Sequence, residues 1–467
     1  MPKSYYIWTV GCQMNEADSQ YVADRAVSAG YAITAVPEEA DVLLINTCTV
    51  RDKAERRAYG RMNHFKQLKD MASHVRLVVM GCLAEQDRDR MQKLAPHVDA
   101  IFGTKELVQL GDQLAAWQPG FSDTVDFSAD RTLMEPLGGT PDAIAGAFTH
   151  LRAFVNVQRG CSYYCTFCIV PQVRGRFDHR PLGEIVAEVR DKIAAGAREI
   201  MLVGQTVNAW RDPVAGADFG DLCKTVAALS RLERLTFISP HPKDFSEKMI
   251  ADLASVACLN PRIHLPLQSA SDPVLRRMNR KYTAAQFREK VDLVHRYLPK
   301  WAITTDVIVG FPGETEADFQ ETLDYVATNV FSNAFMFVYS IRRGTPAAQW
   351  EQVPKDVAAE RFARLVAAQN ASTRAYHDRK IGTTARALIC GTSKKDESKL
   401  TVKALDNVTI VAPKPADYDE AAYAVTPWID VRVEAARLWG CTGTILSRAE
   451  RFDARGRSVE APVLSLL

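Results

Sequence analysis

Three cysteines lie close together in the stretch CSYYCTFC: Cys161, Cys165 and Cys168, here named the loop cysteines, are separated by three and two residues. Thiolates at this spacing converge on one metal centre, and compact cysteine runs are typical of iron-sulfur clusters. A structural zinc ion is the alternative. Zinc normally takes four protein ligands, and no cysteine or histidine lies between Cys168 and His179, so a distant residue such as Cys258 would have to complete the site. An open coordination place is what catalysis at a metal uses.

A second set of three cysteines is spread over the first hundred residues: Cys12 in TVGC, Cys48 in INTC and Cys82 in VMGC, here named the strand-end cysteines. Each lies where a predicted strand ends. Because the carboxyl ends of parallel strands share one edge of a sheet, we expect the three thiols to meet there and to bind a ligand. The alternative for each is an ordinary buried residue. The remaining cysteines show no such pattern and are interpreted as packing residues: Cys223, Cys258, Cys390 and Cys441.

The elements that must position these thiols fall into three segments. Residues 1–118 alternate buried-strand runs with helical patterns near 16–29 and 52–70, which predicts a small parallel α/β sheet. Residues 119–146 are rich in Gly, Pro, Ser, Thr and Asp and form a predicted linker. In residues 147–378, six strand-like runs alternate with helical patterns, near 182–196, 219–231, 244–256, 273–298, 315–329 and 354–378. This order predicts a partial (β/α)6 barrel, whose open side would admit a large substrate.

The C-terminal part and the composition complete the predicted organisation. Residues 380–448 contain short strands that predict a small β-barrel, and 449–467 form a tail. The chain of 467 residues is 47% hydrophobic and 24% charged, as in globular proteins, and its net charge of +2 neither favours nor excludes nucleic acid. It has no apolar run long enough for a bilayer and no secretory signal. We therefore expect a cytoplasmic protein without membrane association, whose reduced thiols are available to metal.

Several motifs resemble a known family. CSYYCTFC matches the C-x3-C-x2-C signature of radical S-adenosylmethionine (SAM) enzymes, and GCSYYCTFCIVPQVRGR, LVGQTVN, HLPLQSASD, TTDVIVGFPGETEADF and YSIRRGTPAA resemble their methylthiotransferase branch, over about residues 3–450. GCQMNEADS and INTCTVRDKAERRAYGRM resemble the MiaB-like tRNA methylthiotransferases more closely than relatives that modify ribosomal protein S12 or N6-threonylcarbamoyladenosine. The C-terminal segment is similar to the TRAM domain, an RNA-binding module. RGRFDHR at 174–180 and YSIRRGT at 339–345 depart from the RGRERSR and YSPRPGT common in relatives.

The resemblance implies a transferase with two 4Fe-4S clusters. The cluster on the loop cysteines would leave one iron for SAM, and the auxiliary cluster on the strand-end cysteines would carry the sulfur to be inserted. The implied reaction replaces C–H by S–CH3 at C2 of N6-isopentenyladenosine at tRNA position 37, with SAM as methyl donor and radical source. A donor such as flavodoxin or ferredoxin and a monomeric state are expected. The alternatives are a methylthiotransferase for N6-threonylcarbamoyladenosine or ribosomal protein S12 and, in another class, a zinc-bearing RNA-binding module.

Polar residues after the predicted barrel strands are candidates for binding SAM, because barrels place their active sites at the carboxyl ends of strands. They are Gly204, Gln205, Ser239, Gln268, Ser269, Asp306 and Gly310. The alternative for each is a role in shaping a loop. RNA phosphates could contact Arg174, Arg176, Arg342 and Arg343 and the basic stretches 51–70 and 361–380, for which solvated charge is the alternative.

Overall fold

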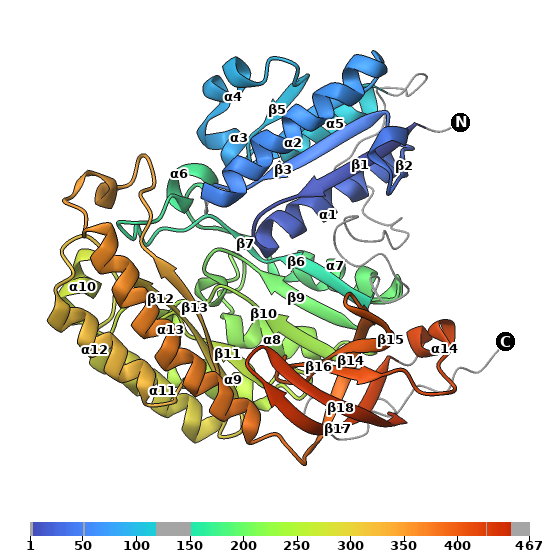
Figure 1. Cartoon of the computed structure of the whole chain (residues 1–467). Helices are drawn as coiled ribbons and strands as arrows, with labels where there is room; N and C mark the ends of the chain where they lie inside the picture. The colour runs from blue at the N-terminus through green and yellow to red at the C-terminus, as the bar shows by residue number, and fades with distance from the viewer. Residues whose placement is uncertain (1–2, 50–51, 118–150, 426, 450–467) are drawn as a thin grey trace.

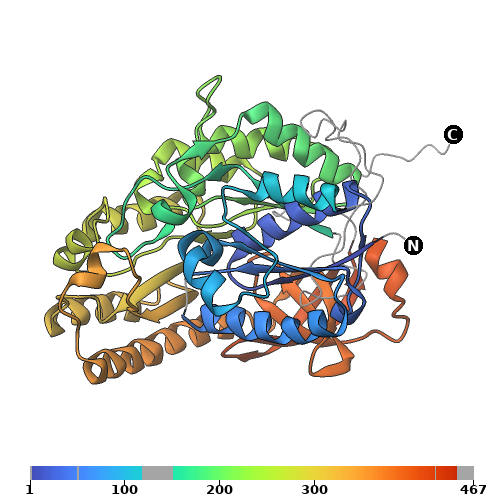
Figure 2. The same cartoon turned by 90° about the horizontal axis from the view of Figure 1, so that it is seen from above.

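The computed structural model describes residues 3–49, 52–117, 151–425 and 427–449 (Figures 1 and 2). The N-terminal part is a parallel sheet of β1 (Ser4–Thr9), β2 (Ala32–Ile33), β3 (Val42–Thr47), β4 (Arg76–Gly81) and β5 (Ala100–Phe102), in the order β2-β1-β3-β4-β5. Helices α1 (Gln13–Ser28) and α5 (Leu107–Ala116) cover one face and α2 (Asp52–Met71) the other. Helices α3 (Cys82–Gln86) and α4 (Arg88–Leu94) follow β4. The predicted small α/β sheet is confirmed.

The central part is an open barrel made of two parallel three-stranded sheets. One contains β6 (Arg152–Asn156), β9 (Glu199–Val203) and β10 (Arg234–Phe237), and the other contains β11 (Arg262–His264), β12 (Ala302–Val309) and β13 (Asn333–Val338). A bridge pairs Leu235 of β10 with Leu259, which lies three residues before β11, and so links the two sheets. Within the described ranges, β13 does not pair with β6. The six strands and the open side are therefore confirmed.

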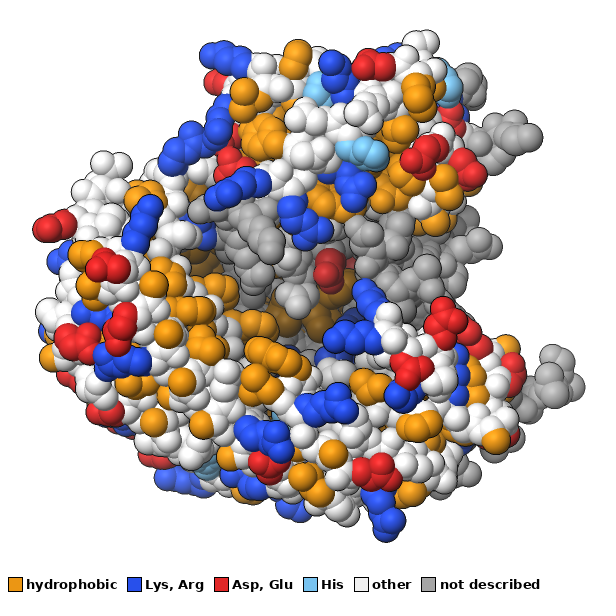
Figure 3. Space-filling view, viewed as in Figure 1, with side chains coloured by type: hydrophobic (Ala, Val, Ile, Leu, Met, Phe, Trp, Pro, Cys, Tyr) orange, Lys and Arg blue, Asp and Glu red, His pale blue; other side chains and the backbone are white. Residues whose placement is uncertain are grey.

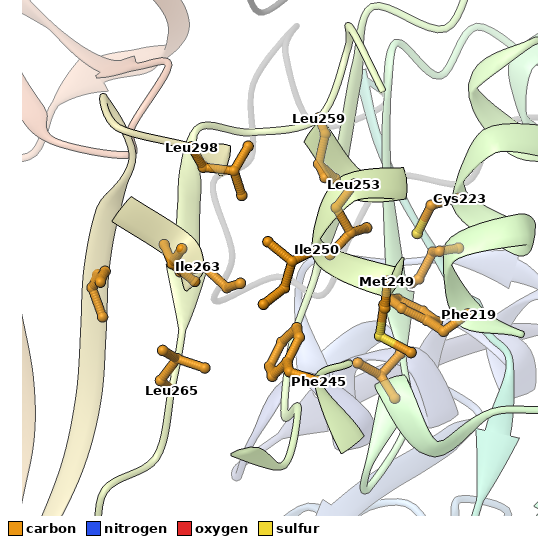
Figure 4. Close-up of a cluster of buried hydrophobic side chains, with 14 of the residues drawn as sticks. Phe219, Cys223, Phe245, Met249, Ile250, Leu253, Leu259, Ile263, Leu265 and Leu298 are labelled. Atoms are coloured by element: carbon orange, nitrogen blue, oxygen red, sulfur yellow. The ribbon is translucent and has the colours of Figure 1, made fainter. Parts of the chain in front are cut away.

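The barrel is surrounded by α7 (Leu182–Ala194), α8 (Phe219–Ala227), α9 (Glu247–Ser255), α11 (Ala284–Tyr297), α12 (Glu316–Ala327) and α13 (Lys355–Asp378). Figure 4 shows Phe245 and the α9 residue Ile250 between Ile263 on one side and Met249 and Phe219 on the other, so that one core spans both sheets. The single helix predicted over 273–298 is wrong. It is two helices, α10 (Asp272–Arg277) and α11, because Asn279 has a φ of 55° and the Thr283 hydroxyl caps α11.

The C-terminal part is a closed five-stranded β-barrel, as predicted. Its strands are β14 (Thr384–Ser393), β15 (Asp396–Ala404), β16 (Thr409–Pro413), β17 (Trp428–Arg437) and β18 (Gly440–Arg448), with α14 (Glu420–Val425) between β16 and β17. It packs against the amino ends of the central strands, where Trp428 Nε1 donates to Glu233 at 2.6 Å. The predicted linker, and all of the tail after Ala449, lie outside the described residues. None of the described helices is long and apolar enough to cross a membrane.

Candidate metal centres and cosubstrate site

The loop cysteines lie between β7 (Gln158–Arg159) and α6 (Val170–Arg174), beyond the carboxyl end of β6. The Cys161 N–H donates to the Gly175 carbonyl at 3.0 Å, which closes the base of the loop. The Asn279 side chain donates to the Tyr164 carbonyl at 2.9 Å, where a φ of 51° turns the chain. The loop is thus anchored to the segment between α10 and α11, which keeps its three thiols on one side of the barrel mouth.

Each loop thiol has a distinct environment. The Cys161 Sγ lies 3.4 Å from the Thr206 hydroxyl, and Arg280 Nη1 donates to the Cys165 Sγ at 3.3 Å. Burial, and after it the neighbouring Cys165, raises the pKa of Cys168 to about 12. Three nearby thiols do not ionise readily together without a cation, and metal ligation requires the thiolate form. The Arg280 guanidinium supplies a positive charge at this place.

The strand-end cysteines meet at the carboxyl edge of the N-terminal sheet, as predicted. Cys12 is the residue before α1, Cys48 directly follows β3, and Cys82 is the first residue of α3. Burial raises the pKa of Cys82 to about 12, Arg174 opposes this rise, and Cys48 and Cys12 add to it. Cys48 and Cys12 therefore lie close enough to Cys82 to act on its thiol electrostatically. Cys12 is exposed and the other two are buried, so the group opens to one side.

A buried amide network supports this edge of the sheet. The Asn15 side chain donates to Asn46 Oδ1 at 2.9 Å, and the Asn46 side chain donates to the Ser19 hydroxyl at 2.8 Å. Gly81, with a φ of 104°, precedes Cys82, and a Cβ there would strike Asn46. Because these amides satisfy one another without water, they fix the backbone beneath the strand-end cysteines.

The two sets of cysteines are brought to the same region by α6. Cys82 packs against Ile169 and Val173, and Ile169 is the residue after Cys168. The Thr104 hydroxyl donates to the Val173 carbonyl, which holds α6 to the N-terminal sheet. A ligand at either set of thiols therefore lies close to the other set.

The donor sets fit iron-sulfur clusters better than single zinc ions. With Zn–S bonds of about 2.3 Å, the sulfurs of a tetrahedral site lie about 3.8 Å apart. Among the described residues, the only His, Cys, Asp or Glu group of three whose ligand atoms all lie within 4.8 Å is Asp218, Asp221 and Asp252. In each set of cysteines at least one pair of sulfurs is therefore more than 4.8 Å apart, a spacing that suits a cluster whose cysteines bind different irons better than one zinc ion.

The structure brings five of the seven predicted SAM-binding residues near the loop cysteines or the barrel interior. Gly204 and Gln205 precede Thr206, and the Gln205 amide has both polar atoms buried without a partner among the described residues. Ser239 is exposed with a φ of 56°. Gln268 donates its N–H to the Asp306 carbonyl at 2.8 Å, and the Asp306 carboxylate lies 3.3 Å from His264 Nε2. The unpartnered Gln205 amide leaves its donor and acceptor groups available to a polar ligand.

The other two predicted residues contact the surrounding helices. The Ser269 hydroxyl lies 3.1 Å from the Thr322 hydroxyl of α12, on the outer side of the sheet. The Gly310 N–H donates to Glu314 at 2.7 Å, and a Cβ at Gly310 would lie 2.7 Å from the Cβ of Ala358 in α13. Their polar groups and packing are therefore directed to the surrounding helices.

The predicted phosphate contact Arg174 is buried, as is one arginine of a predicted basic stretch. Arg174 has a side chain only 5% exposed and pairs with Asp18 of α1 at 2.6 Å, because it closes the junction between the N-terminal sheet and the barrel. In the stretch 361–380, Arg361 is buried against Glu314 at 3.0 Å. Arg343 is exposed but pairs with Asp87, and Arg176 is exposed. The stretch 51–70 retains exposed arginines on α2, including Arg56.

Three residues near the loop cysteines were missed from the sequence. Arg280 lies in the break of a helix that the sequence predicts as continuous, and Thr206 follows a predicted glycine–glutamine pair without a signal of its own. His241 is buried with its Nε2 unpartnered in the described structure, 4.6 Å from the Tyr163 ring, and burial lowers its pKa. Each depends on tertiary contacts that local sequence patterns do not encode.

Comparison with known proteins first defines the class. Residues 155–326 match the Radical SAM superfamily, and residues 4–103 match the Uncharacterized protein family UPF0004. Among solved structures, the radical S-adenosylmethionine methyltransferase TsrM from Kitasatospora setae, with tryptophan and a SAM analogue bound, is similar with a TM-score of 0.54 and 14% identity. That similarity covers 74% of this chain and 75% of TsrM, and it shows a shared fold.

The most informative relatives are named tRNA-2-methylthio-N(6)-dimethylallyladenosine synthase. The protein from Desulfitobacterium hafniense is 36% identical over 97% of this chain and 99% of its own length. That from Stenotrophomonas maltophilia strain K279a is 39% identical over 88% and 87%. The chain belongs to the family of these tRNA-2-methylthio-N(6)-dimethylallyladenosine synthases.

Proposed function

We propose that this protein is a tRNA-2-methylthio-N(6)-dimethylallyladenosine synthase, which replaces the C2 hydrogen of N6-isopentenyladenosine at tRNA position 37 with a methylthio group. The family supports the reaction, because its named relatives extend over nearly the whole chain. The observation that carries the proposal is the packing of Cys82 on Ile169, beside Cys168. A reaction that moves sulfur to a carbon activated by radical chemistry needs its two metal centres at one place.

In this proposal the loop cysteines hold a 4Fe-4S cluster that also binds SAM, and the strand-end cysteines hold an auxiliary 4Fe-4S cluster. When bound, the two clusters supply the electron for SAM cleavage and the sulfur atom for transfer. The protein's own residues bind and orient. The unpartnered Gln205 amide offers a donor and an acceptor to the amino acid part of SAM, and Arg280 stabilises the negative charge on Cys165.

The RNA would enter through the open side of the barrel. Figure 3 shows a hollow between the N-terminal sheet and the C-terminal barrel, with Lys and Arg side chains on the α2 side. Within the barrel, Phe335 is 53% exposed and lies beside the His264 ring at 6.3 Å. A loop nucleotide is single-stranded, so it can turn into such a space and stack on an aromatic ring at small cost. We further expect a monomer that works in the cytoplasm and receives electrons from a flavodoxin or ferredoxin.

Nucleoside mass spectrometry of tRNA from a strain lacking the gene tests this function. The 2-methylthio group on N6-isopentenyladenosine should disappear and should return with the wild-type gene but not with a Cys165→Ala variant. If the strain instead lost the methylthio group of N6-threonylcarbamoyladenosine or of ribosomal protein S12, that molecule would be the substrate, as in the related methylthiotransferases. Anaerobically purified protein should contain about eight irons. Zinc without iron would reject the enzyme and favour an RNA-binding module.

A further inference from the structure

Four cations meet at the end of the central barrel that lies away from the loop cysteines. Arg152, Arg234 and Arg262 are the first residues of β6, β10 and β11, and Lys403 comes from β15 of the C-terminal barrel. Burial, and with it the charges of these three arginines, lowers the pKa of Lys403. We name these four residues the cationic cluster. The mechanism proposed above does not use it.

One carboxylate serves two members of the cationic cluster. Glu199 Oε2 lies 3.0 Å from Arg152 Nη2 and 3.7 Å from Arg234 Nη1. Glu199 is 1% exposed and is the first residue of β9, between β6 and β10. The pairing therefore fixes Arg152 and Arg234 in place and balances one of their two charges.

The side chains of the other two members have no carboxylate partner among the described residues. The Arg262 guanidinium makes no hydrogen bond or ion pair with these residues, and Lys403 Nζ donates to the Thr409 hydroxyl at 2.8 Å. The nearby Asp406 pairs instead with Lys380 and accepts a hydrogen bond from Tyr376. Positive charge thus exceeds negative charge in a confined space, which is unfavourable unless an anion is bound.

Unpartnered donors are present at the same place. Arg234 has a side chain 1% exposed, and its Nε and Nη1 have no hydrogen-bond acceptor among the described residues. The Nε of Arg152 is also buried and has no hydrogen-bond acceptor among the described residues. Buried N–H groups without an acceptor are rare and each costs free energy. The Arg152 side chain is 39% exposed, so the cluster is open to solvent on one side.

We propose that the cationic cluster binds a phosphate group, and that this phosphate belongs to the backbone of the RNA substrate. The oxygens of a phosphate group accept several N–H hydrogen bonds at once, and its negative charge balances the excess positive charge of the cationic cluster. β6 has five residues, and at about 3.3 Å per residue its first residue, Arg152, lies about 13 Å from its carboxyl end at the barrel mouth. This distance corresponds to a phosphate a few nucleotides from the reacting base. The assignment of this phosphate to RNA rests on the proposed function. Free inorganic phosphate is the other ligand that could supply the same group to the cationic cluster.

The test uses Arg262→Gln and Lys403→Gln in the full-length, cluster-loaded enzyme. These members hold no carboxylate, so their replacement should leave the melting temperature unchanged or raised in phosphate-free buffer. Arg190→Gln, on the exposed face of α7, is the charge-matched control. Two probes are used: inorganic phosphate at constant ionic strength, followed by melting temperature, and an anticodon stem-loop RNA containing N6-isopentenyladenosine, followed by affinity at several salt concentrations.

We expect both Gln variants to lose about ten-fold or more in RNA affinity and about one unit of salt slope, while the control behaves as wild type. Phosphate should stabilise the wild type and not the variants. Unchanged RNA affinity and slope would overturn the RNA assignment, and if phosphate stabilisation were still lost, the cluster would bind free phosphate. If the variants had a lower melting temperature but kept the wild-type salt dependence of RNA affinity and the wild-type stabilisation by phosphate, the cationic cluster would have only a structural role. SAM cleavage and the wild-type nucleoside product are measured separately, so failure of the proposed function is recognised on its own.

Discussion

Arg280 offers the sharpest test of how the protein controls a cluster on the loop cysteines. Its Nη1 donates to the Cys165 Sγ at 3.3 Å, and its guanidinium lies 5.2 Å from the Tyr282 ring centroid. Both the positive charge and the hydrogen bond to sulfur stabilise the more negative, reduced state of the cluster. Replacing Arg280 with Gln should therefore lower the reduction potential and make the cluster harder to reduce.

The magnitude follows from the contact distance. Two unit charges about 4 Å apart interact by about 4 kcal/mol at an effective dielectric constant of about 20. The electron added on reduction is shared by the whole cluster, so Cys165 carries only part of it. For a one-electron couple, a tenfold change in the equilibrium constant corresponds to about 59 mV. Loss of this reduced interaction should therefore lower the reduction potential of the cluster by an amount on the order of 100 mV.

The assay is a redox titration followed by electron paramagnetic resonance, on protein whose strand-end cysteines are changed to Ala so that one cluster is observed. Arg280→Lys keeps the charge and should shift the potential less than Arg280→Gln. Arg276→Gln, on the exposed side of α10, is the control for loss of an arginine nearby. Iron content and circular dichroism confirm assembly and folding. A potential within about 20 mV of wild type in well-folded Arg280→Gln would refute the electrostatic reasoning.

Three further predictions concern separate parts of the structure. Cys165→Ala should abolish SAM cleavage. Cys48→Ala should still cleave SAM without transferring sulfur, and it should contain about four irons instead of eight, as product analysis and an iron assay measure. Equal effects of the two variants would contradict the separate roles of the two cysteine sets. Arg174→Met should cost about 3–5 kcal/mol in denaturant unfolding, because it leaves the 2%-exposed Asp18 carboxylate without its cation, and the double variant Arg174→Met/Asp18→Leu should recover most of this loss. Burial raises the pKa of Asp24 to about 6, so its ionised form disfavours the folded state above that pH; Asp24→Asn should stabilise the protein by about 1–3 kcal/mol at pH 7, and the gain should vanish below about pH 4 in thermal melts.

The large elements were predictable because periodic burial determines them. β3 is buried at all six positions, as a central parallel strand with both faces covered must be, and the six barrel strands follow the same logic. The helix over 273–298 was predicted as continuous because its apolar period persists on both sides of the break. Asn279 and the Thr283 cap interrupt it, and local propensity does not outweigh these tertiary contacts.

The candidate metal sites were predictable where the position of a cysteine at the end of a parallel strand determines at which edge of the sheet it lies. Cys12, Cys48 and Cys82 end neighbouring parallel strands, so their convergence follows from topology. The function of charged residues was less accessible. Arg174 follows the cysteine loop in sequence just as an RNA contact would, but it is buried against Asp18. Whether an arginine faces solvent or a partner is decided by the packing of distant segments.

Among the described residues, β6 pairs with β9 on one side only, and helix α1 of the N-terminal part lies against its other edge. Gln20 of α1 accepts a hydrogen bond from the Phe154 N–H at 3.3 Å, and Met14 packs near Phe154. An uncovered strand edge is a template for intermolecular pairing. The N-terminal part thus shields β6 from pairing with another chain, and we expect a fragment beginning near residue 151 to self-associate through β6.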